Sequence, residues 1–166
     1  MTSPSGNRRP SRRRFGGPLA AAALLAFVGA ALAVAAGIPP GVRLAGLGGG
    51  ELTSGDLAKG KTLVVVWASW SPRCRDIVER ANALDARWHG EARVVTVDFQ
   101  EDPAAIRSFL KGKSLKPPVF LDRDGEFSKA LAVTSLPGLV VVRDGEVRYQ
   151  GRLPADADAA IGEALR

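Results

Sequence analysis

The sequence predicts an α/β domain with a mixed β-sheet, preceded by an apolar N-terminal helix. Three observations support this fold class. Apolar, β-branched runs such as 63–68 alternate along the chain with segments of helical periodicity. Turn residues, for example Asp144-Gly145, separate the last two predicted strands. A long uncharged run, residues 18–38, comes before all of these elements.

The N-terminus has the pattern of an export or anchor signal. Residues 1–17 contain five arginines and no acidic residue, and the run 18–38 is long enough to span a bilayer as a helix. Arginines on its N-terminal side predict a cytoplasmic N-terminus, with the domain, residues 39–166, on the periplasmic or exterior side of the cell membrane. Cleavage after Ala33 or Ala36 would instead give a secreted domain. The segment 11–15, Ser-Arg-Arg-Arg-Phe, resembles a twin-arginine export motif, and a plain topology signal is the alternative.

Charge and composition exclude several classes of function for the domain. Outside the N-terminal segment there are 18 basic and 17 acidic residues, so no basic face for nucleic acid is expected. Cys74 is the only cysteine, which excludes an internal disulfide. His89 is the only histidine, so we expect neither a zinc site nor a cofactor, and we place His89 at a helix end near the last carbonyls.

The first half of the domain has clear local signals. Ile38-Pro39-Pro40-Gly41 predicts a linker, 42–52 a small hairpin, and 53–58 a short helical turn. The run 63–68 predicts a central strand buried on both faces, with Trp67 in the core. Ser71-Pro72 predicts a helix start with a hydroxyl cap, and the helix extends to Trp88.

The second half alternates strands and helices in the same way. We expect strands at 93–99, 118–121, 139–142 and 147–150, and helices at 102–112, 126–132 and 154–166. Asp98, Asp122 and Asp124 are interpreted as strand-end or turn residues and not as a carboxylate pair.

Residues 67–74, Trp-Ala-Ser-Trp-Ser-Pro-Arg-Cys, come directly after the predicted central strand. A tryptophan-rich strand end followed by a helix that opens on a cysteine looks like the active site of a thioredoxin-fold protein. Three later segments occur in the matching order: 116–125 with its Pro-Val and Asp-x-x-Gly pattern, 133–137 ending in Leu136-Pro137, and the hairpin 140–147. Over residues 42–166 the chain resembles membrane-anchored thioredoxin-like proteins of the TlpA/ResA/DsbE type.

The resemblance implies a degenerate thiol–disulfide oxidoreductase site. Ser71 occupies the position of the nucleophilic cysteine of the family, and Cys74 that of the resolving cysteine. A hydroxyl cannot exchange with disulfides, so a dithiol cycle is not possible within the chain, and Cys74 supports monothiol chemistry at most. Val65 and Ile77 stand where the family places acidic residues, which indicates that the chain has lost several of the family's active-site residues.

Two alternatives stay open beside monothiol chemistry with protein or peptide thiols and disulfides. One is a redox-inactive peptide-binding module. By resemblance, its groove would be formed by Trp70, Pro72 and Arg73 with the cis-proline loop Leu136-Pro137.

The other alternative is a one-cysteine peroxiredoxin-like peroxidase, since Ser71 and Cys74 fit the Ser-x-x-Cys spacing and Arg73 could favour the thiolate. Peroxiredoxins, however, carry a proline where this chain has Trp67, and only Arg143 or Arg148 could supply their distant arginine.

Overall fold

The computed structural model describes residues 37–166. The predicted segments 1–17 and 18–38 therefore lie outside the described residues, except for Gly37 and Ile38. Gly37 forms an isolated antiparallel bridge with Glu146, and the Ile38 amide donates to the Gly145 carbonyl at 3.1 Å. From Gly37 to the C-terminus, no helix has the length and apolar character needed to cross a bilayer.

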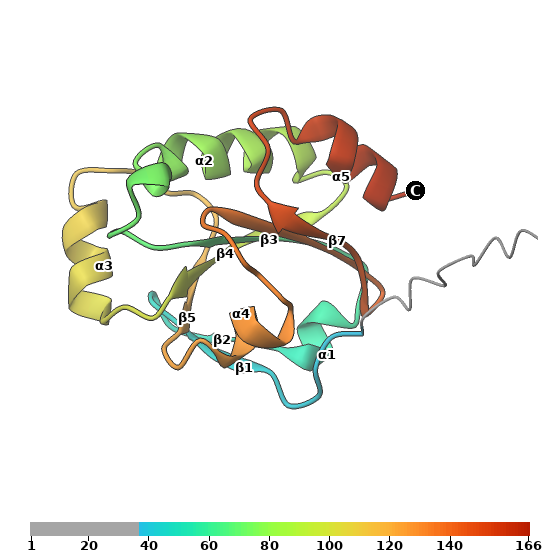
Figure 1. The fold of residues 1–166 in the computed structure, drawn as a ribbon, viewed down its shortest axis with the longest axis horizontal. Coiled ribbons are helices and arrows are strands. Elements are labelled where there is room, and N and C mark those ends of the chain that lie inside the picture. Colours follow the sequence, from blue (N-terminus) through green and yellow to red (C-terminus); the bar gives the residue numbers. More distant parts are fainter. Residues whose placement is uncertain (1–36) are drawn as a thin grey trace, which may run out of the picture. The chain divides into compact units, whose positions relative to one another are not determined.

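A single seven-stranded mixed sheet forms the centre of the domain (Figure 1). Its order is β2-β1-β5-β4-β3-β6-β7, with β3 in the interior. The pairs β3–β4 and β4–β5 are parallel, and the other neighbours are antiparallel. The strands are β1 (Arg43–Gly46), β2 (Glu51–Thr53), β3 (Lys61–Trp67), β4 (Arg93–Phe99), β5 (Val119–Asp122), β6 (Gly138–Arg143) and β7 (Glu146–Arg152).

Helices cover both faces of this sheet. In Figure 1, α2 and α5 lie over one face, and α1 and α4 lie over the other. The helices are α1 (Ser54–Leu57), α2 (Ile77–Trp88), α3 (Pro103–Leu110), α4 (Glu126–Ala130) and α5 (Asp158–Ala164), with a 3-10 turn η1 (Pro72–Cys74) before α2. The predicted mixed α/β fold and its order of elements are confirmed.

The alternation of side chains along the central strands gives the domain two hydrophobic layers. Leu63, Val65 and Trp67 of β3 pack toward α2 and α5, whereas Val64 and Val66 pack toward α1 and α4. Because both faces of β3 are covered, its sequence is apolar without interruption.

The predicted helix start at Ser71 is wrong in detail. Pro72–Cys74 form a 3-10 turn closed by the Cys74 amide on the Ser71 carbonyl at 2.9 Å, and the Ser71 hydroxyl makes no cap bond. The backbone leaves the helical region at Asp76 (φ −99°, ψ 19°), so the α-helix begins only at Ile77. At its other end, the ring of His89 lies 2.9 Å from the Asp85 carbonyl, as predicted.

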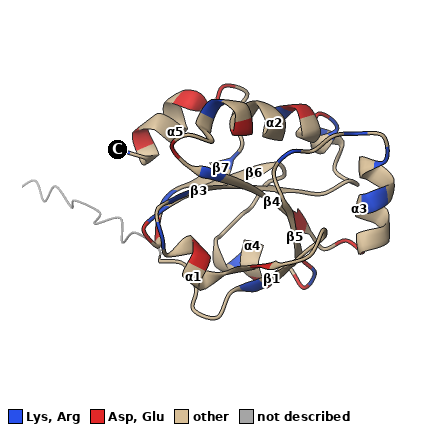
Figure 2. Cartoon of the chain, turned by 180° about the vertical axis from the view of Figure 1, so that it is seen from behind, with Lys and Arg blue, Asp and Glu red and all other residues tan. Residues whose placement is uncertain are grey.

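Charged residues are interspersed over the described domain. Figure 2 shows acidic and basic residues interspersed along the layer formed by α2 and α5, and one basic residue on α3, Arg107.

Candidate functional site

The loop between β3 and α2 carries the predicted site residues. Ser71 is buried, Pro72 and Arg73 are exposed, and Cys74 is 0% exposed. The Ser71 amide donates to the Ala68 carbonyl at 3.2 Å, which folds the loop tightly against the end of β3. The thiol is therefore covered by the core, whereas Ser71, Pro72 and Arg73 line a groove at the surface.

Cys74 belongs to the hydrophobic layer beneath α2. Its neighbours in that layer include Trp67, Ile77 and Leu139. A thiol in such surroundings behaves as a small apolar side chain, because the thiolate that would react is not solvated there. This burial disfavours direct attack by the Cys74 thiol on a peroxide or a disulfide.

A groove of about 540 Å³ lies beside this loop. Trp70 stands at its edge with 60% of its surface exposed, the only large hydrophobic residue exposed in the described part of the chain. Apolar walls come from Phe99, Val133 and Leu136. Ser128 of α4 also lines it and is only 2% exposed, and its hydroxyl has no hydrogen-bond partner within residues 37–166.

The loop from α4 to β6 forms the opposite wall of the groove. The peptide bond between Leu136 and Pro137 is cis, as the resemblance implied. The Pro137 carbonyl accepts from Leu153, whereas the amide and carbonyl of Leu136 make no hydrogen bond with the described residues. Unpaired main chain next to an apolar groove can pair with an extended peptide.

The site also contains a buried acid that the sequence analysis misinterpreted. Asp98 is 1% exposed, pairs in register with Trp67, and shares the strand face of Val94 and Thr96, which is the face toward Cys74. Asp98 lies one residue before the end of β4, as predicted, but its burial and its neighbour Glu101 were not anticipated. Burial, and then the hydrogen bond and charge of Glu101, raise the pKa of Asp98 to about 8.

The protonation of Asp98 explains how two acids lie together. The Glu101 carboxylate accepts hydrogen bonds from the Ser69 amide at 2.5 Å and from the Ser69 hydroxyl. Each of its oxygens therefore bonds to Ser69, just after the end of β3. With both groups ionised, the Asp98 oxygens have no donor among residues 37–166. A protonated Asp98 can instead donate a hydrogen bond to Glu101, which removes the repulsion between two buried carboxylates.

No metal centre is evident in the described residues, where no three His, Cys, Asp or Glu side chains gather around a common point. The arrangement instead offers an apolar groove, an unpaired backbone edge and a buried thiol.

Comparison with known proteins gives a family and several relatives for this chain. The Redoxin family model covers residues 33–165. The thiol-disulfide oxidoreductase ResA of Bacillus thuringiensis is 29% identical over 92 residues, which are 54% of this chain and 53% of the relative. The sporulation thiol-disulfide oxidoreductase A of Bacillus subtilis is 26% identical over 52% of this chain and 56% of its own. The chain thus spans about half the length of the curated relatives it matches.

Solved structures share the fold over a larger part of the chain. The thiol:disulfide interchange protein DsbE of Chlorobium tepidum superimposes with a TM-score of 0.67 and 25% identity over 78% of this chain and 96% of its own. The exposed lipoprotein thioredoxin Etrx1 of Streptococcus pneumoniae has a TM-score of 0.65 and 21% identity, over 75% of this chain and 97% of its own. A secreted disulfide oxidoreductase of Mycobacterium tuberculosis has a TM-score of 0.61 and 20% identity, over 74% of this chain and 93% of its own.

The structure brings together most of the residues that the sequence singled out. Trp70, Ser71, Pro72, Arg73 and Leu136 all line the groove. Pro137 is buried beside it and lines the neighbouring pocket, and Cys74 lies below the surface. Sequence reasoning missed three polar side chains, namely Asp98, Glu101 and Ser128. The central position of 93–99 in a parallel sheet was the available signal for Asp98, since such a strand is covered on both faces.

Proposed function

Because this chain belongs to the Redoxin family, we propose that it is a TlpA/ResA/DsbE-type thioredoxin-like protein whose groove binds extended peptides and whose Ser71–Cys74 site does not turn over disulfides. Its fold is that of thiol-disulfide oxidoreductases, and protein thiols and disulfides are the class of partner that its relatives' names suggest. In this chain the partner is held chiefly by non-covalent contacts.

One observation carries the proposal: a solvent-exposed tryptophan faces an unpaired main-chain edge across an apolar groove. Trp70 is an exposed aromatic residue at the edge of an apolar groove, and aromatic residues dominate the energetics of binding surfaces. Leu136 supplies the hydrogen-bonding groups that a strand-like peptide needs.

The chemistry of the loop supports binding over catalysis. Ser71, at the position of the family nucleophile, cannot form a mixed disulfide, and Cys74 is covered by the core. Monothiol exchange through Cys74 would require the loop 69–76 to open first.

We further propose that the domain is exported and held at the cell membrane by residues 18–38, with residues 1–17 as the cytoplasmic basic segment. The arginine-before-apolar order supports this topology. Two structural neighbours are described as a secreted protein and an exposed lipoprotein, which agrees with an extracytoplasmic location. Release after cleavage of the segment is the second option.

The test uses the purified full chain and two measurements. Binding of a fluorescent, acetylated and amidated heptapeptide with a central phenylalanine is followed by anisotropy for the native chain and for Trp70→Ala. Lys59→Ala is the matched control, because Lys59 is an exposed residue before β3, at the other end of the sheet. We expect binding that Trp70→Ala weakens and Lys59→Ala does not.

Alkylation of Cys74 by iodoacetamide is then compared in native and urea-unfolded chain. Strong protection in the native state is expected, together with no sulfenate after peroxide treatment. Reaction at the unfolded rate would reject the redox-inactive assignment in favour of monothiol chemistry, and rapid sulfenate formation would favour the peroxidase.

A further inference from the structure

A second pocket, of about 510 Å³, lies on the other side of the cis-proline. Its lining includes Arg73 from η1, Arg80 from α2 and Arg152 from the end of β7, together with Asp76 and Pro137. We call these five residues the basic pocket. Three guanidinium groups and one carboxylate give it a positive charge within a domain that is otherwise nearly neutral.

The three arginines form no ion pair within the described chain. None of them lies within 4.0 Å of a carboxylate of the described chain. Arg73 and Arg152 are exposed. Unpaired guanidinium groups with several N–H donors are well suited to carboxylates, which they can bind through two parallel hydrogen bonds.

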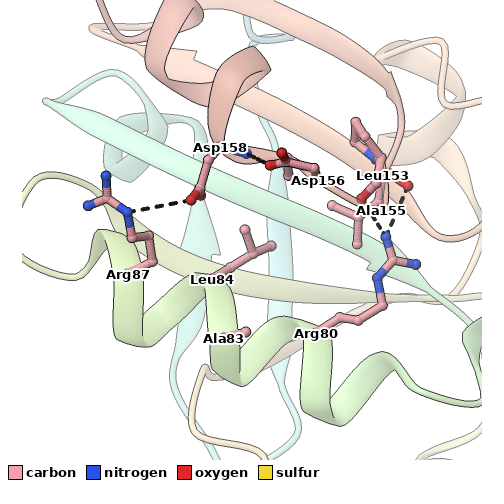
Figure 3. A pocket seen from close by; sticks show the side chains of 10 residues that line it. Arg80, Ala83, Leu84, Arg87, Leu153, Ala155, Asp156 and Asp158 are labelled. Atoms are coloured by element: carbon pink, nitrogen blue, oxygen red, sulfur yellow. Dashed lines mark hydrogen bonds and ion pairs between the residues drawn. The ribbon is translucent and has the colours of Figure 1, made fainter.

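Arg80 is held in place from the opposite side. One of its terminal nitrogens donates to the carbonyls of Leu153 and Pro154, at 3.0 and 2.7 Å, as Figure 3 shows. These bonds direct the side chain from α2 toward the start of the segment between β7 and α5. Figure 3 draws the adjacent pocket, which Arg80 also lines, and there Arg87 is paired with Asp158 at 3.5 Å.

The basic pocket and the groove adjoin along the chain. Arg73 lines both of them, Leu136 lines the groove, and the next residue, Pro137, lines the basic pocket. An extended peptide advances about 3.3 Å per residue, so a segment paired with Leu136 reaches from one pocket to the other within a few residues. Its side chains would meet apolar walls first and guanidinium groups next.

We propose that the preferred partner is an extended acidic peptide segment: a large apolar side chain fills the groove, and one or more neighbouring carboxylates enter the basic pocket. This inference rests on the proposed peptide-binding function and specifies its substrate class. Carboxylates of a polypeptide are favoured over free phosphate because the adjoining groove and the Leu136 edge provide for the rest of a peptide chain.

The test compares four heptapeptides on the full chain by fluorescence anisotropy. The acidic peptide has a central phenylalanine flanked by serines, with two glutamates at each end. The others replace all glutamates by glutamine, replace them by lysine, or replace the phenylalanine by serine. We expect the glutamine peptide to bind about three- to tenfold more weakly than the acidic one, as partly exposed charge pairs allow. The lysine peptide should bind more weakly still.

The double variant Arg73→Glu/Arg152→Glu should invert this order and favour the lysine peptide. Lys59→Glu, a single charge reversal at an exposed position at the far end of the sheet, should leave the order unchanged, and inorganic phosphate should not displace the acidic peptide. Thermal unfolding of each variant checks that the fold is retained.

Three outcomes overturn the inference in different ways. Equal binding of the acidic and glutamine peptides, with loss of binding by the serine variant, would reject the basic pocket but keep the proposed function. No binding by any peptide would reject both. Displacement by phosphate would show that the pocket recognises anions without regard to the peptide.

Discussion

Replacing Asp98 by asparagine should change how the stability of the domain depends on pH. The Asp98 carboxyl is buried and lies beside Glu101, with Asp122 contributing further negative charge, and its pKa is raised to about 8. In the unfolded chain an aspartate titrates near its ordinary value of about 3.9. Asparagine has the same shape, can donate its amide to Glu101, and does not ionise.

The sign and size of the effect follow from proton linkage. Below about pH 4 both states hold the proton and Asp98 adds no pH dependence. Between pH 4 and 8 the unfolded chain has released the proton while the folded domain keeps it. The free energy of unfolding therefore falls by about 1.4 kcal/mol per pH unit over this range. The full shift of Asp98 corresponds to on the order of 5 kcal/mol.

The assay is urea unfolding of both proteins, followed by tryptophan fluorescence at half-unit steps from pH 5 to 7.5. The stability of Asp98→Asn minus that of the natural sequence should grow by about 3 kcal/mol across this interval. Ionisable groups that do not interact with Asp98 contribute equally to both proteins and cancel. Asp124→Asn, which changes an exposed carboxylate in the turn after β5, is the control and should run parallel to the natural sequence. Parallel curves for Asp98→Asn would mean that Asp98 ionises normally and that the buried pair has been misinterpreted.

Three further substitutions test other parts of the structure. Trp70→Ala should weaken peptide binding by about tenfold or more, as loss of a central aromatic contact does. Because the side chain is exposed, the free energy of unfolding should change by less than about 0.5 kcal/mol. A large loss of stability would place the side chain in the core instead. Ser71→Cys should create a disulfide-reductase activity measurable by insulin reduction, and an inactive but folded variant would show that the site lacks more than one sulfur. Ile161→Ala in α5 should cost about 2–5 kcal/mol in urea unfolding, since its side chain is fully buried under the sheet; a cost below 1 kcal/mol would mean that α5 packs loosely.

Much of the fold could be predicted because its signals are local. The run 63–68 is apolar at every position, which only a strand covered on both faces requires, and it became β3. The segments 93–99 and 139–142 had similarly clear patterns and became β4 and most of β6.

The details that sequence reasoning missed depend on tertiary contacts. Ser71-Pro72 carries a strong helix-start signal, yet the chain turns back onto Ala68 and forms a 3-10 turn, so the α-helix begins only at Ile77. Asp98 has the appearance of a solvent-facing strand end until Glu101 and the helix layer cover it. The basic pocket combines arginines that are 79 positions apart at most, and no local pattern links them.

The point at which the chain enters the domain has a consequence for access. Gly37 and Ile38 are tied to the turn between β6 and β7, which lies beside the start of β3, whereas Trp70 follows its end. The seven residues of β3 separate these two points by about 23 Å. The described chain thus enters the domain at the pole opposite the groove, about the length of β3 away from Trp70.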